Sequence, residues 1–197
     1  MIAILDYGSG NLRSAERAFQ NSGTEVLVTS DYETALNADG LVVPGVGAFA
    51  ACMNGIRKIN GNELIKTRIQ NKKPIFGICV GMQILFDAGL ENGKHDGLGV
   101  LPGVVEKLEA DILPHMGWNT VRVSGNSKLF AGVENERFYF VHSYAVIKSK
   151  FEVNAICDYG QEFLAAVETG VISATQFHPE KSGEAGVQLI KNWVKTL

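Results

Sequence analysis

The chain has 197 residues, of which 46% are hydrophobic and 20% are charged, which is ordinary for a globular protein with one sizeable core. Its formal net charge of −3 argues against a nucleic-acid or anionic-membrane partner held by bulk electrostatics. No apolar run approaches the roughly 18 residues of a membrane span, so we expect no membrane partner.

The first half of the chain alternates strand and helix signals. Asn11 is expected to cap the first helix, Ser30 to open a capping box, and a third helical stretch to cover Ala48–Asn71 with a break near Gly61. Buried strands are expected at Met1–Asp6, Glu25–Thr29, Leu41–Val43 and Pro74–Ile78. This order of elements implies a parallel sheet with helices on both faces.

The second half changes character, because short segments with alternating or β-branched residues replace the helical stretches. The strands expected there are Val104–Glu109, Asn119–Val123, Arg137–Val141, Asn154–Asp158, Phe163–Glu168 and Val171–Phe177. A closing helix is expected from Ser182 onward. The sequence therefore predicts one α/β domain over residues 1–197, with a mostly parallel central sheet flanked by helices and antiparallel additions in the C-terminal half.

Cys79 is the most informative residue of the sequence. It follows the predicted strand Pro74–Ile78 and lies between Gly77 and Gly81, just before a stretch that favours a helix. A strand, a sharp glycine-flanked turn and a helix form a nucleophile elbow, which exposes one side chain at the top of a sheet. The free amides at the start of a helix would favour a thiolate there. The alternative is an inert, buried cysteine.

A thiol nucleophile needs a base, and the base needs a group that orients it. His178 follows the predicted strand Val171–Phe177 and is followed by Pro179 and Glu180. Proline favours extended backbone in the residue before it, and in extended geometry residues 178 and 180 point to the same side. Glu180 would then hold one ring nitrogen of His178 while the other faces Cys79. The alternative is a histidine with an ordinary structural role.

An acyl-transfer site also needs donors for an oxyanion. The amide of Val80, the residue after the nucleophile, is one candidate. The second comes from Val46 and Gly47, because Pro44-Gly45-Val46-Gly47 is a glycine-flanked turn after a predicted strand; a plain loop is the alternative. Since a peptide between two glycines flips at low steric cost, we expect the Val46 amide to point away from the substrate until a partner activates the subunit.

The other histidines and cysteines carry weaker signals. His95 and His115 are assigned no catalytic role, and His142 is expected to be structural or a cavity wall. Cys52 and Cys157 are expected in the core. A sparse cysteine set without a CxxC pair fits a reducing compartment and gives no thiolate metal site. Because the chain opens as a strand with no basic leader, we expect a cytoplasmic protein.

The elbow at Cys79 and the segment His178-Pro179-Glu180 resemble those of the triad glutamine amidotransferases, which have a flavodoxin-like fold. Further motifs narrow the resemblance, over essentially the whole chain, to the amidotransferase subunits of imidazole glycerol phosphate synthase. These motifs are Asp6–Leu12, Pro44–Gly47, His115–Asn119, Phe140–Tyr144 and His178–Gly183. The sequence departs from the family pattern at Val80, where leucine is usual, and at Ser9, where methionine or a similar residue is common.

The resemblance implies a reaction and a partner. Cys79 would attack the carboxamide of glutamine, His178 would move the protons, and water would release glutamate from a thioester. Ammonia would pass to a separate (β/α)₈-barrel cyclase subunit, in a heterodimer that makes imidazole glycerol phosphate and aminoimidazole carboxamide ribotide in histidine biosynthesis. Neither a metal nor an organic cofactor is expected.

The resemblance also assigns positions around the site. The residues it implies for binding glutamine are Gly45, Gly47, Gln83, Glu91, Ser143 and Tyr144, with the Glu91 carboxylate facing the substrate amine. The residues it implies for the partner interface or the ammonia path are Asn11, Trp118, Tyr139 and Lys181. The alternative for these four is a helix cap, a core indole, a strand aromatic and a solvated lysine.

Two other functions stay open. The same chemistry would serve a glutaminase of another pathway, such as anthranilate or pyridoxal phosphate synthesis, although the segment His115–Asn119 speaks against it. A non-catalytic α/β binding module that kept the fold is the second alternative. The presence of the elbow, the base and the orienting acid together speaks against a binding module.

Overall fold

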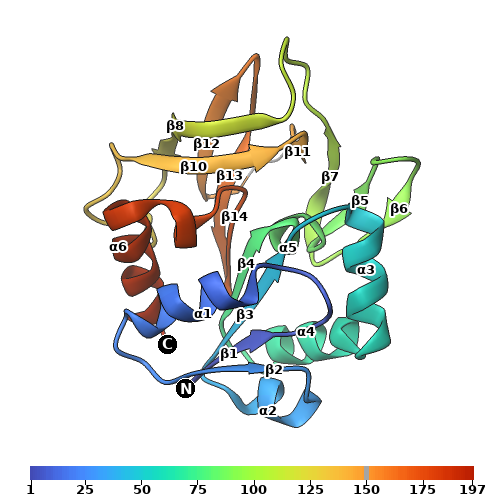
Figure 1. Ribbon diagram of the computed structural model, residues 1–197, viewed down its shortest axis with the longest axis vertical. Helices are drawn as coiled ribbons and strands as arrows, with labels where there is room; N and C mark the ends of the chain where they lie inside the picture. The colour runs from blue at the N-terminus through green and yellow to red at the C-terminus, as the bar shows by residue number, and fades with distance from the viewer. Residues whose placement is uncertain (149–150) are drawn as a thin grey trace.

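Eight strands form the central sheet, in the order β2-β1-β3-β4-β14-β13-β12-β9 (Figure 1). The computed structural model describes residues 1–148 and 151–197. The strands from β2 to β14 are parallel: β1 (Ile2–Leu5), β2 (Val26–Thr29), β3 (Gly40–Gly45), β4 (Ile75–Cys79) and β14 (Ile172–Thr175). All residues of β1, β3 and β4 are buried, as expected for parallel strands that are covered on both faces.

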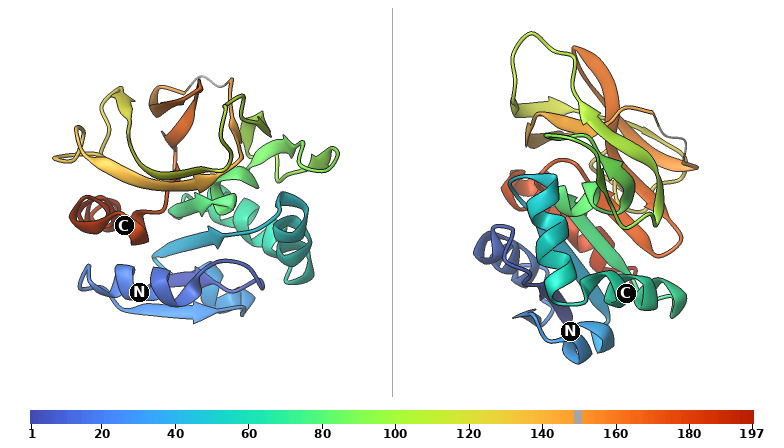
Figure 2. Two further views of the ribbon diagram at one scale, coloured as in Figure 1. Left: turned by 45° about the horizontal axis from the view of Figure 1, so that its top comes forward. Right: turned by 90° about the vertical axis from the view of Figure 1, so that its right-hand side faces the viewer.

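Helices cover both faces of the parallel half. The helices α1 (Leu12–Gln20) and α6 (Gly183–Val194) pack together on one face, and the other face carries α2 (Tyr32–Asn37), α3 (Phe49–Lys58) and α4 (Gly61–Gln70) (Figures 1 and 2). Right-handed crossovers require this division. The connection from β1 to β2 runs toward the β2 edge of the sheet, whereas the connections from β2 to β3 and from β3 to β4 run in the opposite direction.

The second half adds antiparallel strands. The strands β13 (Gln161–Thr169), β12 (Val153–Tyr159) and β9 (Arg122–Ser124) extend the central sheet beyond β14. Two smaller sheets lie beside it: β8 (His115–Thr120) with β10 (Arg137–His142), and β11 (Tyr144–Val146) with β7 (Leu101–Lys107), β5 (Phe86–Gly89) and β6 (His95–Asp96). The β8–β10 ribbon crosses above α6 in both views (Figures 1 and 2). The predicted α/β fold, mostly parallel with antiparallel additions, is confirmed.

Two helix signals in the first half are confirmed and one is shifted. Asn11 caps α1 by accepting a hydrogen bond from the Ser14 amide. The expected break near Gly61 lies at Asn60, which has a left-handed φ of 54° between α3 and α4. The cap of α2 is Asp31 rather than Ser30, because the Asp31 carboxylate accepts from the amide at the third helical position, 2.8 Å away.

One strand prediction was wrong, and the predicted helix after Cys79 is present but short. The predicted strand Asn119–Val123 is two strands, because residues up to Thr120 pair with β10 whereas those from Arg122 pair with β12. The helix after Cys79, α5 (Val80–Gln83), has only four residues, since the apolar run that follows it is fully buried and leads into β5. A helix this short has only a small dipole, so packing and neighbouring groups must stabilise the thiolate.

Two aromatic clusters fix the segments that carry the site. Trp193 of α6 stacks on Phe76 of β4 with ring centroids 5.2 Å apart, and this contact holds α6 against the sheet. Phe177 stacks on Phe138 of β10 at 4.3 Å, which fixes the segment directly before His178. Within the described residues, no helix is both long and apolar enough to cross a membrane.

Candidate active site

The chain reverses at Cys79, where β4 ends and α5 begins. Cys79 has φ 55° and ψ −115°, a conformation that residues with a side chain rarely adopt and that costs about 1–3 kcal/mol. Close glycine packing enforces it: a Cβ on Gly81 would lie 1.8 Å from the Val43 carbonyl oxygen, and one on Gly77 would lie 2.9 Å from the Gly81 carbonyl oxygen. The strained turn therefore holds the sulfur at the carboxyl end of β4.

His178 reaches the same edge from the neighbouring strand. Thr175 of β14 pairs with Ile78 of β4, so the chain leaves β14 beside Cys79. The Nδ1 atom of His178 lies 2.7 Å from Oε1 of Glu180, and both side chains are almost fully buried. The buried Nε2 atom has no well-aligned hydrogen-bond partner among the described residues. Loose contacts between a base and its nucleophile are common in enzymes without bound substrate.

The neighbours of His178 set its charge. Burial alone lowers the pKa of His178, but the nearby Cys79 and the hydrogen-bonded Glu180 outweigh burial and raise that pKa from 6.5 to about 10. The arrangement therefore favours a protonated imidazole ring between Cys79 and Glu180. A thiolate is the nucleophilic form of cysteine, so the site can carry out acyl transfer.

Cys79 and His178 open into a cavity of about 300 Å³. Its lining residues are Val46, Gly47, Cys79, Val80, Gln83, Glu91, Val141, His142, Ser143, Tyr144 and His178. All residues named from the sequence for the oxyanion and the substrate are among them, with the exception of Gly45. Gly45 packs against the elbow instead: a Cβ there would lie 2.4 Å from the Gly81 amide nitrogen. Its missing side chain lets β3 approach α5.

Gln83 and Gln176 form a buried amide pair beside the nucleophile. The Nε2 atom of Gln83 donates to the Tyr144 carbonyl and to Oε1 of Gln176, both at 2.9 Å. The Nε2 atom of Gln176 lies 3.7 Å from the Cys79 sulfur and donates to it. Sequence reasoning missed Gln176, although in an extended segment a residue two positions before His178 shares its side.

Glu91 has a structural bond as well as a place in the cavity wall. Its Oε2 atom accepts a hydrogen bond from the Phe49 amide at 2.8 Å, at the start of α3. Ala48, the residue at the cap position, makes no side-chain hydrogen bond there. Glu91 therefore caps α3 from a distant segment, and this contact fixes the carboxylate at the cavity.

The Val46 peptide is held from outside the cavity. Its N–H donates to Oγ of Ser9 at 3.1 Å, and the Ser9 hydroxyl donates to the Val46 carbonyl at 2.8 Å. Ser9 lies in the loop before α1 and does not line the cavity. The Val46 amide is therefore directed toward Ser9 and away from the substrate position, as the glycine spacing led us to expect. Sequence reasoning did not identify Ser9 as its partner.

The four residues named for the partner or the ammonia path lie outside the cavity, on one side of the molecule. Trp118 and Tyr139 face each other across β8 and β10 with ring centroids 6.0 Å apart, and Trp118 is 47% exposed. Lys181 is exposed on the short 3₁₀ turn Pro179–Lys181, which packs against both β10 and α1. Asn11 lies at the start of α1. Trp118 is therefore not the core indole of the alternative interpretation.

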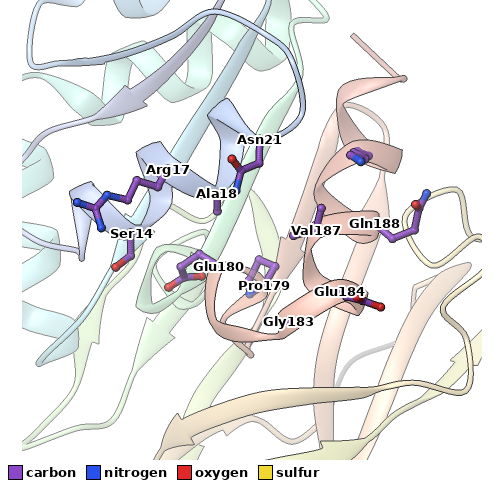
Figure 3. A pocket seen from close by; sticks show the side chains of 11 residues that line it. Ser14, Arg17, Ala18, Asn21, Pro179, Glu180, Gly183, Glu184, Val187 and Gln188 are labelled. Atoms are coloured by element: carbon purple, nitrogen blue, oxygen red, sulfur yellow. The ribbon is translucent and has the colours of Figure 1, made fainter.

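A larger hollow of about 640 Å³ lies between α1 and α6 (Figure 3). Glu180 lies at its edge, where Figure 3 shows the carboxylate on the side of Ser14 and Arg17 of α1. The Oε2 atom of Glu180 is buried without a hydrogen-bond partner in the described part of the chain. Because Cys79 and His178 do not line this hollow, the chemistry belongs to the smaller cavity.

Comparisons with known proteins agree with this geometry. A family model described as glutamine amidotransferase class-I matches residues 3–197. A protein of Nocardia farcinica, described as imidazole glycerol phosphate synthase subunit HisH, is 55% identical, and the alignment covers 100% of this chain and 98% of that protein. A protein of Bifidobacterium longum with the same description is 52% identical, with 98% of each chain covered. A crystal structure described as a glutamine amidotransferase has the same fold, with a TM-score of 0.78 at 19% identity over 100% of this chain and 99% of that chain.

Proposed function

The chain belongs to the class-I glutamine amidotransferase family, and from this premise we infer that it is the glutaminase subunit of imidazole glycerol phosphate synthase in histidine biosynthesis. It hydrolyses glutamine to glutamate and ammonia, and the ammonia serves the formation of imidazole glycerol phosphate and aminoimidazole carboxamide ribotide. The observation that carries this function is the buried His178 between Glu180 and Cys79. We propose that residues 1–197 act as one amidotransferase domain and do so in the cytoplasm.

The reaction follows from the charge state of the pair. The Cys79 thiolate adds to the carboxamide carbon of glutamine and gives a tetrahedral oxyanion. As that intermediate collapses, the C–N bond breaks, the imidazolium of His178 gives its Nε2 proton to the leaving nitrogen, and ammonia departs from a thioester. Water then loses a proton to Nε2 while it attacks the thioester, the C–S bond breaks, and glutamate leaves. Glu180 keeps the ring in position throughout.

Two amides are proposed to bind the oxyanion. The Val80 amide is the first of α5, so it has no acceptor within the helix and lies at the cavity. The second donor is the Val46 amide, with Gly47 providing the freedom to turn, since its φ is +87°. Because the Val46 amide is bonded to Ser9, the subunit needs a rearrangement of this peptide before both donors face the substrate.

The polar groups of the cavity suit the ends of a glutamine molecule. We propose that the Glu91 carboxylate binds the substrate ammonium and that the backbone of Ser143 and Tyr144 lies along the substrate. Gln83 offers Oε1, because both hydrogens of its Nε2 are already donated. Gly45 is proposed to support the elbow and to make no direct contact with the substrate.

The partner is proposed to be the (β/α)₈-barrel cyclase subunit, in a heterodimer. On β8, Met116 is 62% exposed and Trp118 is 47% exposed, so this ribbon presents an apolar face. Asn11, Tyr139 and Lys181 surround the same side of the molecule. This face lies next to the turn that carries Glu180, which gives ammonia a short route from the nucleophile to the partner.

Glutamate release from glutamine, measured with the cyclase partner present, tests this function. Cys79→Ala should abolish release, whereas Cys157→Ala, a matched change at another buried cysteine, should retain it. Full activity in Cys79→Ala would end the proposal. A glutamine-like electrophile should label Cys79 selectively, and a non-catalytic binding module would show no such labelling. Co-purification with an anthranilate synthase chain in place of a barrel cyclase would assign the glutaminase to another pathway.

A further inference from the structure

A continuous, largely buried hydrogen-bond chain runs along the wall of the cavity and ends at Cys79. It begins at Asn119 of β8, whose Nδ2 atom lies 3.4 Å from Nε2 of His115. The Nδ1 atom of His115 lies 3.1 Å from Nε2 of His142, and the Nδ1 atom of His142 lies 3.0 Å from the Tyr144 carbonyl oxygen. The Tyr144 oxygen accepts from Gln83, Gln83 donates to Gln176, and Gln176 donates to the Cys79 sulfur.

The carbonyl of Tyr144 fixes the tautomers of both rings. A carbonyl oxygen only accepts, so Nδ1 of His142 carries a hydrogen. Burial lowers the pKa of His142 to about 3 and that of His115 to about 4, so both rings are neutral at physiological pH. Nε2 of His142 is then an acceptor, and Nδ1 of His115 must carry the hydrogen that it receives. Nε2 of His115 in turn accepts from Asn119.

Hydrogens are donated from Asn119 through both histidines to the Tyr144 carbonyl, whereas Gln83 donates both to that carbonyl and, through Gln176, toward Cys79. The Tyr144 oxygen receives two hydrogen bonds, one from His142 and one from Gln83, and these occupy its two lone pairs. The same bonds set the orientation of the Gln83 amide, because its Nε2 must face Tyr144 and Gln176. Gln83 is therefore held with its oxygen, and not its nitrogen, available to a ligand.

Packing holds the two rings in place. His115 is 2% exposed and stacks on Tyr159 and Phe140, with ring centroids 4.0 and 4.8 Å away. His142 is 7% exposed and meets Phe163 edge-on at 4.8 Å. Burial of two polar rings is favourable only where their nitrogens are paired, and here all four nitrogens have a partner. Such a fully satisfied network is rigid.

We propose that His142 and His115 are positioning residues for glutamine hydrolysis, which hold Gln83 and, through Gln176, the Cys79 sulfur in place by way of the Tyr144 carbonyl. This inference rests on the proposed glutaminase function and deepens it. The signal was in the sequence as two histidines, His115 and His142, which pair directly across β8 and β10. Neither contacts Cys79, so neither is itself catalytic.

The first test replaces His142. His142→Phe keeps a ring against Phe163 but removes both hydrogen bonds, and we expect kcat/KM for glutamine to fall about 10-fold. His142→Asn keeps a donor near the Nδ1 position and should recover most of that loss, to within about threefold of the wild type. His95→Phe is the matched control outside the network and should change kcat/KM by less than about twofold. Equal losses in His142→Phe and His142→Asn would overturn the proposal.

The second test does not depend on glutaminase activity. The rate of Cys79 alkylation by iodoacetamide should fall in His142→Phe and recover in His142→Asn, because the sulfur loses and regains its fixed place. Long-range ¹H–¹⁵N NMR of the full chain at pH 7 should show His115 and His142 with the hydrogen on Nδ1. A hydrogen on Nε2 of either ring, or a protonated ring, would overturn the network. A wild-type chain without glutaminase activity but with these tautomers would instead refute the proposed function.

Discussion

The two walls of the cavity keep buried histidines in opposite charge states. On the elbow side, His178 is 2% exposed and its pKa is raised to about 10, because a thiol and a carboxylate outweigh the effect of burial. On the opposite wall, His142 is 7% exposed and burial lowers its pKa to about 3. His142 contacts a carbonyl and a neutral ring. Similar burial therefore leaves one ring protonated and the other neutral, and the neighbouring groups decide between these two states.

The two walls also differ in how firmly their polar groups are held. The Tyr144 carbonyl has two buried donors, from His142 and Gln83, within a continuous network. The Val46 backbone is held by the Ser9 hydroxyl and, at its carbonyl, by a longer contact from the Cys52 thiol at 3.5 Å, and 43% of Val46 is exposed. The elbow side thus holds the proposed proton carrier and a partly exposed peptide, whereas the polar groups on the Tyr144 side are fixed by buried hydrogen bonds.

Removal of the Glu180 carboxyl group, which pairs with Nδ1 of His178, is expected to have the largest effect. In Glu180→Gln the ring loses its carboxylate partner, so the pKa of His178 should fall and the ring should lose its fixed orientation. We expect kcat for glutamine hydrolysis to fall about 10³-fold with a smaller change in KM. Glu184→Gln, an exposed neighbour at the hollow between α1 and α6, is the matched control. A kcat within about 10-fold of the wild type would contradict this role for Glu180.

The elbow wall was predictable from the sequence because its causes are local. Gly77, Cys79 and Gly81 lie within five residues, and the steric reasons for the turn are contacts that these glycines make possible. The bond between His178 and Glu180 joins residues two positions apart, so extended backbone was sufficient to predict it. The fold followed for the same reason, since buried strands that alternate with helices permit few arrangements.

The opposite wall was not predictable, because its bonds join distant segments. Gln83 and Tyr144 are 61 positions apart in the sequence, and Gln176 and Cys79 are 97 apart. These contacts exist only after β10, β11 and β14 have packed around α5, and no periodicity encodes that packing. Sequence reasoning set no length for α5, whose end depends on a long-range pairing between β5 and β7.

A fall in pH should destabilise the folded protein, because His115 and His142 are buried as neutral rings. The folded pKa values of His142 and His115 lie below the unfolded value of 6.5, so their stabilising contribution is present above pH 6.5 and is lost as the pH falls toward 4. Between pH 6.5 and 4.5 we expect each ring to remove about 2 kcal/mol from the free energy of unfolding, and the pair about 4 kcal/mol. Urea unfolding at both pH values measures the loss.

A variant sharpens this acid test. His142→Asn removes one titrating ring, so its free energy of unfolding should fall less than that of the wild type over the same interval. His95→Asn, a histidine outside the buried pair, should leave the wild-type difference unchanged. Parallel losses in the wild type and in His142→Asn would show that the buried ring does not titrate in this way.

A rise in pH should lower the free energy of unfolding, because His178 is protonated in the folded protein. The folded pKa of His178 lies above the unfolded value of 6.5, so its contribution is fully present below pH 6.5 and is lost as the pH rises through about 10. Cys79→Ala removes one of the two groups that raise this pKa. The drop in the free energy of unfolding between pH 7 and 10 should therefore be smaller in Cys79→Ala, by about 1 kcal/mol. An identical drop in the wild type and in Cys79→Ala would show that Cys79 does not raise the pKa of His178.

The smallest expected effect is a change in glutaminase activity on removal of the Ser9 hydroxyl, which accepts the hydrogen bond of the Val46 amide. Ser9→Ala removes the two hydrogen bonds between Ser9 and Val46 and leaves the Val46 amide free to turn toward the oxyanion, although the Cys52 thiol still contacts the Val46 carbonyl. Glutaminase activity without the partner should therefore rise about threefold. Activity with the partner should stay close to that of the wild type, because the peptide is then already turned. Ser22 lies just beyond α1, and its hydroxyl donates to the Phe19 carbonyl of that helix. Ser22→Ala removes this comparable hydrogen bond and should change neither activity. If Ser9→Ala left the activity without partner unchanged, the hydroxyl would not be what restrains this peptide, and both walls of the cavity would be equally rigid.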